Sequence, residues 1–263
     1  MEAEKYSEGE SMFIVDFDDT NYQEWYADSI ESANKCMNEK TATWININCS
    51  CKSTLIDELT EYFGFSGIVS TNLSDNNSCT QLMVYPEYAY LSFFNLNFNL
   101  ENFTLSNDRI CSILGKEIIL TFQENSGALF FPIREKIKSS TGIVRRMKID
   151  YLQYLLLNTV VENMHKQFED VKHLTAQLEK GIEEKNNEQI FQLKKMLIDS
   201  REHVLPLVNA LSNMNRASGL IASRMMIYYD DLLAKAQRNF RTLESQIEQL
   251  NNIQLYRYSS INQ

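Results

Sequence analysis

The stretch SGLIASRMMIYYDDLLAKAQRNFRTLESQIEQLNNIQLYRYSSINQ, residues 218–263, decides the fold because it has the pattern of one very long helix. At 1.5 Å per residue, about 45 residues reach roughly 65–70 Å, which exceeds the width of a small domain. Its apolar face needs neighbours, either the two preceding helical segments or copies of itself in an oligomer. Apolar residues recur in steps of three or four, as one helix face requires: Ile221, Met225, Tyr228, Leu232, Ala236, Phe240, Leu243, Ile247, Leu250 and Ile253.

The end of this helix carries no stop signal. Helices usually end at a glycine or asparagine cap, a basic last turn or a nearby proline. In LYRYSSINQ (255–263) only Asn262 is of this kind, and no glycine or proline follows Gly219. We therefore expect the helix to run on beyond Gln263, toward a membrane.

The segments before this helix divide the chain into two regions. Helical spacing covers about residues 126–140, 148–184 and 187–214, with breaks at Gly142, 181–187 and 215–219. Helical spacing also covers residues 22–35 and 53–63, the latter with Ser53 as a capping residue. The sequence thus predicts a mixed α/β domain, residues 1–147, and a helical region, residues 148–263. The β-rich runs of the first region are 12–17, 43–48, 81–86, 88–98, 109–114 and 117–122.

Composition argues against several classes of protein. The chain has 263 residues, 44% hydrophobic content and a net charge of −10. Residues 1–130 hold 20 acids and 6 bases, a net charge of −14, whereas residues 131–263 hold 15 acids and 19 bases, a net charge of +4. The acidic half and the absence of a continuous basic stripe argue against nucleic-acid binding. Without a run of about 18 apolar residues or a signal peptide, we expect a soluble cytosolic piece.

Cysteine and histidine spacing gives only weak metal signals. Cys49 and Cys51 have the spacing of a soft metal clip, but no zinc-ribbon spacing is present, which indicates reduced thiols. Glu162 and His165 have the Glu-x-x-His spacing of di-metal bundles without the required second copy, so we expect a solvated helix face. The cysteines are Cys36, Cys49, Cys51, Cys79 and Cys111.

The stretch IVDFDDT (14–20) resembles the first motif of haloacid-dehalogenase-type phosphatases. In that hypothesis Asp16 is the nucleophile, Asp18 the acid/base, and Mg²⁺ neutralises charge. The chemistry also needs a Ser/Thr strand, for which IVST (68–71) is the match, and a second acidic pair on the same sheet. The later pair, Asp230 and Asp231, lies in the long helix instead. The alternative is an acidic turn after an edge strand.

Several stretches, in this order and at these separations, resemble the cytoplasmic region of the CorA family of divalent-cation (Mg²⁺/Co²⁺) channels. Family members typically read T-W-I-N-I, then T-F-Q-E with a P-x-R-E-R-I helix, then D-Y-L-L-Y. The resemblance covers nearly the whole chain from about residue 40. Its specificity lies in the joint order of the stretches, which are TWININ (43–48), ILTFQENSGALFFPIREKI (119–137), DYLQYLLLNTVVEN (150–163), QLKKMLIDSREHVLPL (192–207) and YYDDLL (228–233).

The resemblance implies an α+β fold in which an α/β/α domain with a mixed sheet precedes two antiparallel helices beside a long stalk. It also implies a funnel-shaped homopentamer at the cytoplasmic face of the cell membrane, and no enzyme. In the family, the stretch that residues 255–263 resemble continues into the first transmembrane helix and a Gly-Met-Asn signature. We therefore expect this chain to be truncated before the first membrane span.

The resemblance also implies regulation by metal. In the family, Mg²⁺ bound between neighbouring cytoplasmic domains holds the pore closed, and its loss opens the pore. The matching positions are Asp230 in the stalk, the loop pair Thr71 and Asn72, and Asn158, with Asp231 as an alternative ligand. Among the matching positions only Asp230 is an acidic residue, as it is in the family. We therefore expect weak regulatory Mg²⁺ binding, with Co²⁺ as a further cation.

The sequence therefore predicts the regulatory, metal-sensing domain of a CorA-like magnesium/cobalt channel. A zinc-transporting relative of the same fold is the near alternative. The alternatives from other classes are a Mg²⁺-dependent phosphatase that uses Asp16 and a helical scaffold that binds protein partners.

Overall fold

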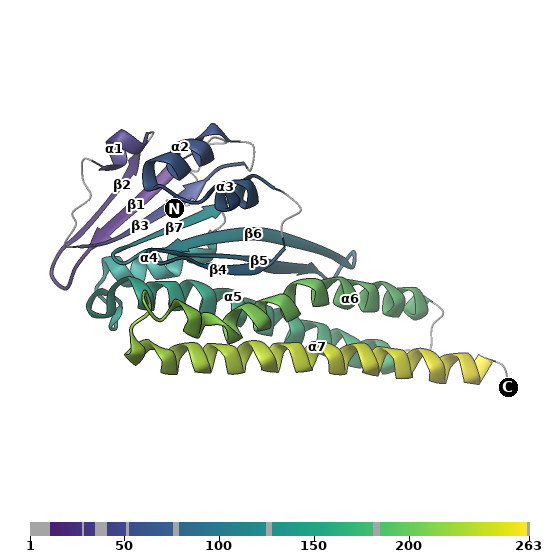
Figure 1. Cartoon of the computed structure of the whole chain (residues 1–263). Coiled ribbons are helices and arrows are strands. Elements are labelled where there is room, and N and C mark those ends of the chain that lie inside the picture. Colours follow the sequence, from purple (N-terminus) through teal and green to yellow (C-terminus); the bar gives the residue numbers. More distant parts are fainter. Residues whose placement is uncertain are drawn as a thin grey trace.

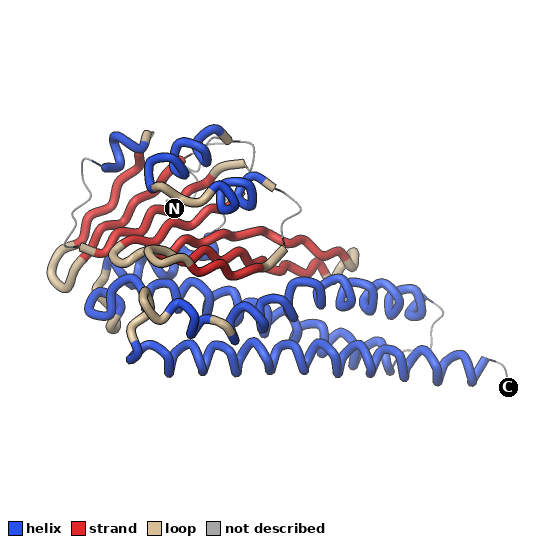
Figure 2. Tube along the Cα trace, in the orientation of Figure 1, coloured by secondary structure: helices blue, strands red, loops and turns tan. Residues whose placement is uncertain are grey.

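The structure, a computed structural model, describes residues 11–27, 29–34, 41–50, 53–75, 79–124, 128–180 and 185–261. One sheet lies between two layers of helices (Figure 1). Three short helices cover one face, and the longer helices of the second half of the chain cover the other. Figure 2 shows the strands as one layer with helices on both sides. The predicted α+β fold, with a mixed sheet followed by long helices, is confirmed.

The sheet has the strand order β2-β1-β3-β7-β6-β5-β4. The β3–β7 pair is parallel and the other pairs are antiparallel, so the sheet is mixed. Each of the six predicted β-rich runs contains a strand of this sheet. The described strands are β1 (Ser11–Phe17), β2 (Tyr22–Ala27), β3 (Ala42–Asn48), β4 (Gln81–Val84), β5 (Ala89–Asn99), β6 (Thr104–Leu114) and β7 (Ile118–Gln123).

Both faces of the sheet are buried. Along β1, Phe13 and Val15 belong to the core under the long helices, whereas Met12 and Ile14 belong to the core under the short ones. This alternation follows from the two-residue period of a strand. It also explains why the strand reads as an almost continuous apolar run, since a strand covered on both sides has no solvent face.

The helix predicted for residues 22–35 is wrong. Residues Tyr22–Ala27 form the edge strand β2, and only Ile30–Asn34 form a helix, α1; Lys35 lies outside the described residues. The strand contains tyrosine and tryptophan, which favour strands, and it pairs with β1 along its whole length. Pairing with a neighbouring strand therefore outweighs the helical spacing of its apolar residues.

The two helices after β3 begin at serine caps. For α2 (Thr54–Phe63) the cap is Ser53, as predicted: its hydroxyl accepts a 3.0 Å hydrogen bond from the backbone N–H two residues on. The helix ends at Gly64, whose φ of 66° is the left-handed conformation that favours glycine. The next helix, α3 (Gly67–Ser74), is an addition to the predicted elements, and Ser66 caps it in the same way.

Four helices form the opposite layer within the described residues, and the last three of them in chain order are long. They are α4 (Phe131–Lys138), α5 (Val144–Lys180), α6 (Lys185–Ser212) and α7 (Met226–Ile261). They confirm the predicted helical runs. The predicted boundary between residues 147 and 148 stays a prediction, and one hydrophobic core includes residues from both sides of it.

The breaks between these helices lie close to their predicted positions. Gly142, with φ +81°, separates α4 from α5. The break predicted at 215–219 is a 3₁₀ turn, Met214–Ala217, and α7 begins later than expected. The break predicted at 181–187 falls partly on residues 181–184, outside the described residues. A further kink inside α5 lies at Lys148, where φ is 63° and ψ is −144°.

Helix α7 is the predicted stalk. Its 36 residues give a length of about 54 Å, and its C-terminal end projects past the sheet (Figure 1). The apolar stripe, including Leu232, Leu243 and Leu250, packs against α5 and α6 of the same chain. The sequence left two kinds of neighbour open for this stripe, the preceding helices or copies of the same helix. In the structure the stripe packs on the preceding helices. No described helix has an apolar stretch that could cross a membrane.

Candidate functional site

The Asp16 carboxylate, which the phosphatase hypothesis makes a nucleophile, lies buried in β1. It accepts hydrogen bonds from the hydroxyls of Thr41 and Thr43, both at 2.7 Å. A nucleophile has to face its substrate. These bonds instead tie Asp16 to the neighbouring strand, so its setting is structural.

Asp18, the acid/base of the same hypothesis, closes the turn between β1 and β2. Its carboxylate accepts bonds from the backbone N–H groups of Thr20 (2.7 Å) and Asn21 (2.6 Å). Hydrogen bonds from Asn21 and Thr20 lower the pKa of Asp18, the opposite of what a general acid at neutral pH needs. The predicted acidic turn is confirmed, although β2, not β1, is the edge strand. The Ser/Thr strand expected at residues 68–71 is wrong, because this segment lies in α3.

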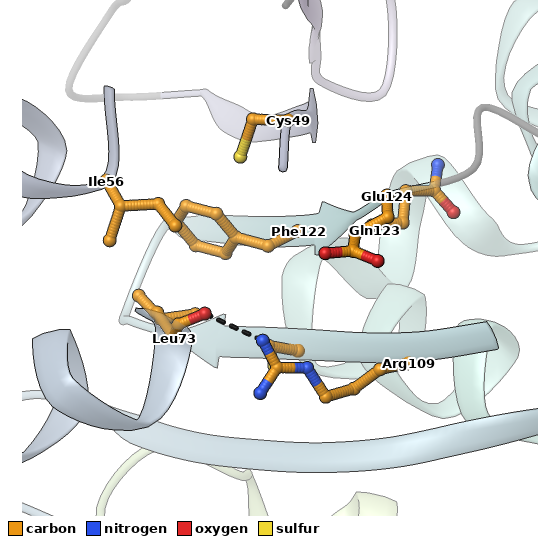
Figure 3. Close-up of a pocket in the computed structure, with 8 residues that line it drawn as sticks. Cys49, Ile56, Leu73, Arg109, Phe122, Gln123 and Glu124 are labelled. Atoms are coloured by element: carbon orange, nitrogen blue, oxygen red, sulfur yellow. Dashed lines mark hydrogen bonds between the residues drawn. The ribbon is translucent and has the colours of Figure 1, made fainter. Parts of the chain in front are cut away.

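A small pocket opens near the carboxyl ends of the parallel strands β3 and β7, where α/β sheets often bind ligands (Figure 3). Its volume of about 20 Å³ has room for about one water molecule. On one side, the Arg109 guanidinium donates a 2.7 Å hydrogen bond to the carbonyl oxygen of Leu73 in α3. The pocket is too small for a substrate, and its arginine binds the end of a helix.

Among the described residues, no three His, Cys, Asp or Glu side chains come together to hold a metal ion. Glu162 is exposed, as predicted for a solvated helix face, whereas His165 is half-buried. Cys51 of the predicted cysteine clip lies outside the described residues, as does Cys36. Within the described part of the chain, Cys49, Cys79 and Cys111 form no disulfide with one another.

Thr71 and Asn72 lie in helix α3, so the loop expected for this pair is wrong. Thr71 is exposed, and its hydroxyl donates to the carbonyl of Gly67 at 2.9 Å. Asn72 is half-buried, and its amide lies 3.9 Å from the sulfur of Met83. Arg109 fixes the end of this helix by donating to the Asn72 carbonyl at 2.9 Å.

The other expected ligands lie on the long helices. Asp230 is exposed on α7, and its carboxylate makes no hydrogen bond or ion pair with any residue that the structure describes. Asp231 is also exposed, but it forms a 3.1 Å ion pair with Lys235 one turn further along the helix. Asn158 is half-buried in α5 and accepts a hydrogen bond from the same lysine.

The sheet separates these two groups of expected ligands. Helix α3 packs on one face through Val69 and Leu73, whereas α7 belongs to the core on the opposite face (Figure 1). Thr71 and Asn72 of one chain therefore do not meet Asp230 of the same chain.

The structure instead gathers side chains of α5 and α7 around Lys235. Its ammonium donates to Asn158 Oδ1 at 3.0 Å and lies 3.1 Å from both Glu162 Oε1 and Asp231 Oδ2. Burial alone would lower the pKa of Lys235, but the hydrogen bonds with Asp231 and Glu162 raise it above its ordinary value. We call these four residues, Asn158, Glu162, Asp231 and Lys235, the Lys235 cluster.

Sequence reasoning missed Lys235 and the position of Glu162 beside it. A signal was present, because Asp231 and Lys235 have the i,i+4 spacing of neighbours on one helix face, as do Asn158 and Glu162. Only the register of α5 against α7 shows that the two pairs meet.

The expected ligands do not form a Mg²⁺ site within one chain. Mg²⁺ favours carboxylate oxygens in octahedral geometry and keeps several of its waters. Asn158 and Asp231 already bind an ammonium, and Thr71 and Asn72 lie on the other side of the sheet. Of the expected set, Asp230 alone offers a carboxylate that no described residue binds.

Sequence comparison places the chain among metal-ion transport proteins and gives the family. The model of the CorA-like Mg²⁺ transporter protein family matches residues 39–263, so the chain belongs to this family, which is one of transporters rather than enzymes. The chain is 26% identical over 235 residues to the cobalt/magnesium transport protein CorA of Thermotoga maritima. That match covers 87% of this chain and 66% of the relative, slightly under two thirds of its length.

Solved structures show the same fold. The ZntB cytoplasmic domain from Vibrio parahaemolyticus superposes with a TM-score of 0.78 at 10% identity, over 95% of this chain and 98% of that one. The CorA magnesium transporter from Methanocaldococcus jannaschii gives a TM-score of 0.76 at 16% identity, over 95% of this chain and 77% of that one. At these identities the likeness concerns the fold alone.

Proposed function

We propose that this chain is the cytoplasmic, metal-sensing region of a divalent-cation transporter, which gates the passage of Mg²⁺ or Co²⁺ through a membrane. The observation that carries the proposal is the family match over residues 39–263, supported by the likeness to a cobalt/magnesium transport protein over 87% of the chain. In this proposal the membrane-spanning helices follow α7, and the chain faces the cytoplasm.

The geometry favours assembly of several copies, and the family resemblance implies five. One face of α7 packs on α5 and α6, which leaves the opposite face, with Ile227 and Asp230, exposed. Because the sheet separates Asp230 from Thr71 and Asn72, a metal ion that joins them has to bridge two copies. Such a bridge would couple cation binding to the arrangement of the copies.

Flux measurements test the proposed function. The complete reading frame that contains this chain is expressed, and its protein product is reconstituted in liposomes. Entry of Mg²⁺, Co²⁺ and Zn²⁺ is then followed separately with fluorescent indicators. We expect entry of Mg²⁺ and Co²⁺. Entry of Zn²⁺ alone would favour the zinc-transporting alternative, and the absence of flux for all three cations would contradict the proposal.

A second test concerns regulation by Mg²⁺. We expect a small rise in melting temperature with millimolar Mg²⁺, since a ligand stabilises the state that it binds. Asp230→Asn should abolish this rise, because it removes the carboxylate that has no described partner. Asp231→Asn should leave the rise in melting temperature unchanged, because Asp231 is bound to Lys235. Asn72→Asp should enlarge the rise by adding a carboxylate. The reverse result for the two stalk aspartates would reassign the ligand to Asp231.

A further inference from the structure

Helix α5 is interrupted at one residue, Lys148. The backbone N–H of Met147 still donates to the carbonyl of Ile143 at 2.9 Å, as in an ordinary helical turn, and the helical conformation resumes at Ile149. Lys148 alone departs from it, with a φ of 63° and a ψ of −144°, close to a backbone conformation that glycine alone adopts readily. The 37 residues of α5 include no glycine or proline, so the sequence itself permits an unbroken helix.

On the N-terminal side of the kink, the chain is fixed to α4. The Arg145 guanidinium donates hydrogen bonds to the carbonyl of Ile137 at 2.7 Å and to that of Lys138 at 2.8 Å. These carbonyls belong to the last turn of α4, where they have no partner within the helix. We call these two bonds the α4 clamp. Val144 beside it is buried in the core, so the residues before the kink move with α4.

On the C-terminal side, the buried residue Asp150 joins α5 to the start of the stalk. Its carboxylate accepts hydrogen bonds from the backbone N–H of Tyr151 at 2.9 Å and from that of Ala222, in the turn that leads into α7, at 3.2 Å. Its backbone carbonyl accepts a 3.1 Å hydrogen bond from the hydroxyl of Tyr229 in α7. We call the two bonds between Asp150 and residues 222 and 229 the stalk clamp. Both helices begin at the same end of the molecule (Figure 1), and the residues after the kink move with the stalk.

We propose that Lys148 is a strained hinge, which the α4 clamp and the stalk clamp hold in its kinked conformation and which relaxes toward an unbroken helix when the stalk clamp opens. A strained residue persists only where its surroundings determine its conformation. Among the described residues the Lys148 side chain makes only a 3.6 Å ion pair, with Glu117, which is too weak to do so. The clamps determine it instead, because they fix the chain to two different helices within three residues on either side of the hinge.

The hinge couples the direction of the stalk to the rest of the fold. Helix α4 packs in the core that lies between the sheet and the long helices. A movement of α7 that separates Ala222 from Asp150 lets Lys148 relax, and its return restores the strain. The strain therefore lowers the free energy needed to open the stalk clamp and shifts the balance between the kinked and straight forms. The use of this hinge in gating rests on the proposed function, whereas the strain and its release do not.

Thermal unfolding of a set of single and double variants tests the hinge. Lys148→Gly should raise the melting temperature of the wild-type chain by about 2–4 °C, because glycine adopts the kinked conformation without strain. In the Asp150→Ala background the same substitution should give no rise, or a fall. There Lys148 has already relaxed into a helix, in which glycine is unfavourable.

Three further backgrounds assign the loss of the rise to the stalk clamp. Ser53→Ala lowers stability far from the hinge by removing the cap of α2, so Lys148→Gly should keep its full effect there. Asp150→Asn keeps an oxygen acceptor for the clamp and should keep most of the effect. Ala222→Pro opens the clamp from its other side, because residue 222 has a φ of −63°, as proline does, and the substitution removes the N–H donor. The effect should be lost there as in Asp150→Ala.

Hydrogen exchange measured by mass spectrometry follows the opening of the stalk clamp. In Asp150→Ala the amides of residues 222–229 should exchange at least tenfold faster than in wild type, because the start of the stalk is released. The amides of residues 243–250, which remain packed on the neighbouring helices, should exchange within about twofold of wild type.

The inference is supported if Lys148→Gly stabilises wild type and Ser53→Ala but neither Asp150→Ala nor Ala222→Pro. It is overturned if the substitution gives no rise in wild type, if the rise is equal in all backgrounds, or if exchange at residues 222–229 is unchanged in Asp150→Ala. It is also overturned if neither clamp variant folds, since the clamp is then not one that opens. None of these measurements involves cation flux, so a failure of the proposed function leaves the hinge untouched.

Discussion

At the scale of single residues, Lys148 has an unusual backbone conformation at the point where α5 kinks. Its φ of 63° and ψ of −144° are strained for a residue with a Cβ atom. Among the described residues its side chain makes only an exposed 3.6 Å ion pair, with Glu117, and such pairs contribute little. We expect Lys148→Gly to raise the free energy of unfolding by about 1 kcal/mol, because glycine adopts positive φ without strain.

Urea unfolding followed by circular dichroism measures this change. Lys148→Ala is the matched control, since it removes the ion pair but keeps the Cβ atom, and it should leave stability within about 0.5 kcal/mol of wild type. Equal effects of the two substitutions would show that the kink is not strained.

The role of a single residue could be predicted when the contacts that determine it lie close in the sequence. Ser53 was predicted correctly as a cap because its hydroxyl bonds the backbone only two residues away. The environment of Asp231 was not predicted, because it depends on residues of α5 more than 60 positions earlier in the chain. Only the fold brings these residues together, so the sequence could place Asp231 on a helix face but not beside Glu162.

At the scale of elements, two buried amides fix α7 against α5. The Asn239 side chain donates to the carbonyl of Val161 at 2.8 Å, and the Gln246 side chain donates to that of Phe168 at 2.6 Å. The donors are seven residues apart, and so are the acceptors, as two helices in constant register require. The two helices therefore run parallel and in one register over this segment.

We expect Asn239→Ala and Gln246→Ala each to lower the free energy of unfolding by about 1–3 kcal/mol, because each removes a buried hydrogen bond and packed atoms. Gln237→Ala, at an exposed position of the same helix, should change it by less than about 0.5 kcal/mol. Chemical denaturation of the three variants provides the measurement. Equal stabilities would mean that the apolar stripe alone sets the register.

Helices and strands could be predicted from the sequence where one periodic pattern of apolar residues determined them. The long helices and the buried strands have periodicities that persist over many residues, so they were predicted at nearly the right places. The β2 strand was mistaken for a helix because a six-residue edge strand has little periodicity of its own and forms by pairing with β1. Helix α3 was missed because GIVSTNLS is short and has no clear apolar face, although Ser66 was a possible cap.

At the scale of the whole molecule, net charge and exposed apolar residues act in opposite directions on association. Each copy carries a net charge of −10, so copies repel one another. The outward face of α7 nevertheless exposes Ile227 and Leu255, at 71% and 68%, close to opposite ends of the stalk. A second apolar stripe, Phe191, Ile198 and Leu205, is exposed on α6 at seven-residue spacing. Both surfaces are available to a partner copy.

We expect copies to associate through α7, because the stalk is the element that projects beyond the rest of the fold. Ile227→Asp combined with Leu255→Asp should weaken association at least tenfold, since burial of two such side chains contributes several kcal/mol. Phe191→Asp combined with Ile198→Asp should leave association nearly unchanged. Sedimentation velocity over a range of protein concentrations measures both double variants. Association of wild type should also strengthen as salt rises to about 0.15 M, because the Debye length falls to about 8 Å and screens the repulsion between acidic copies. If the α6 variant were the one to dissociate, the copies would meet through α6, and Asp230 would lie away from the interface.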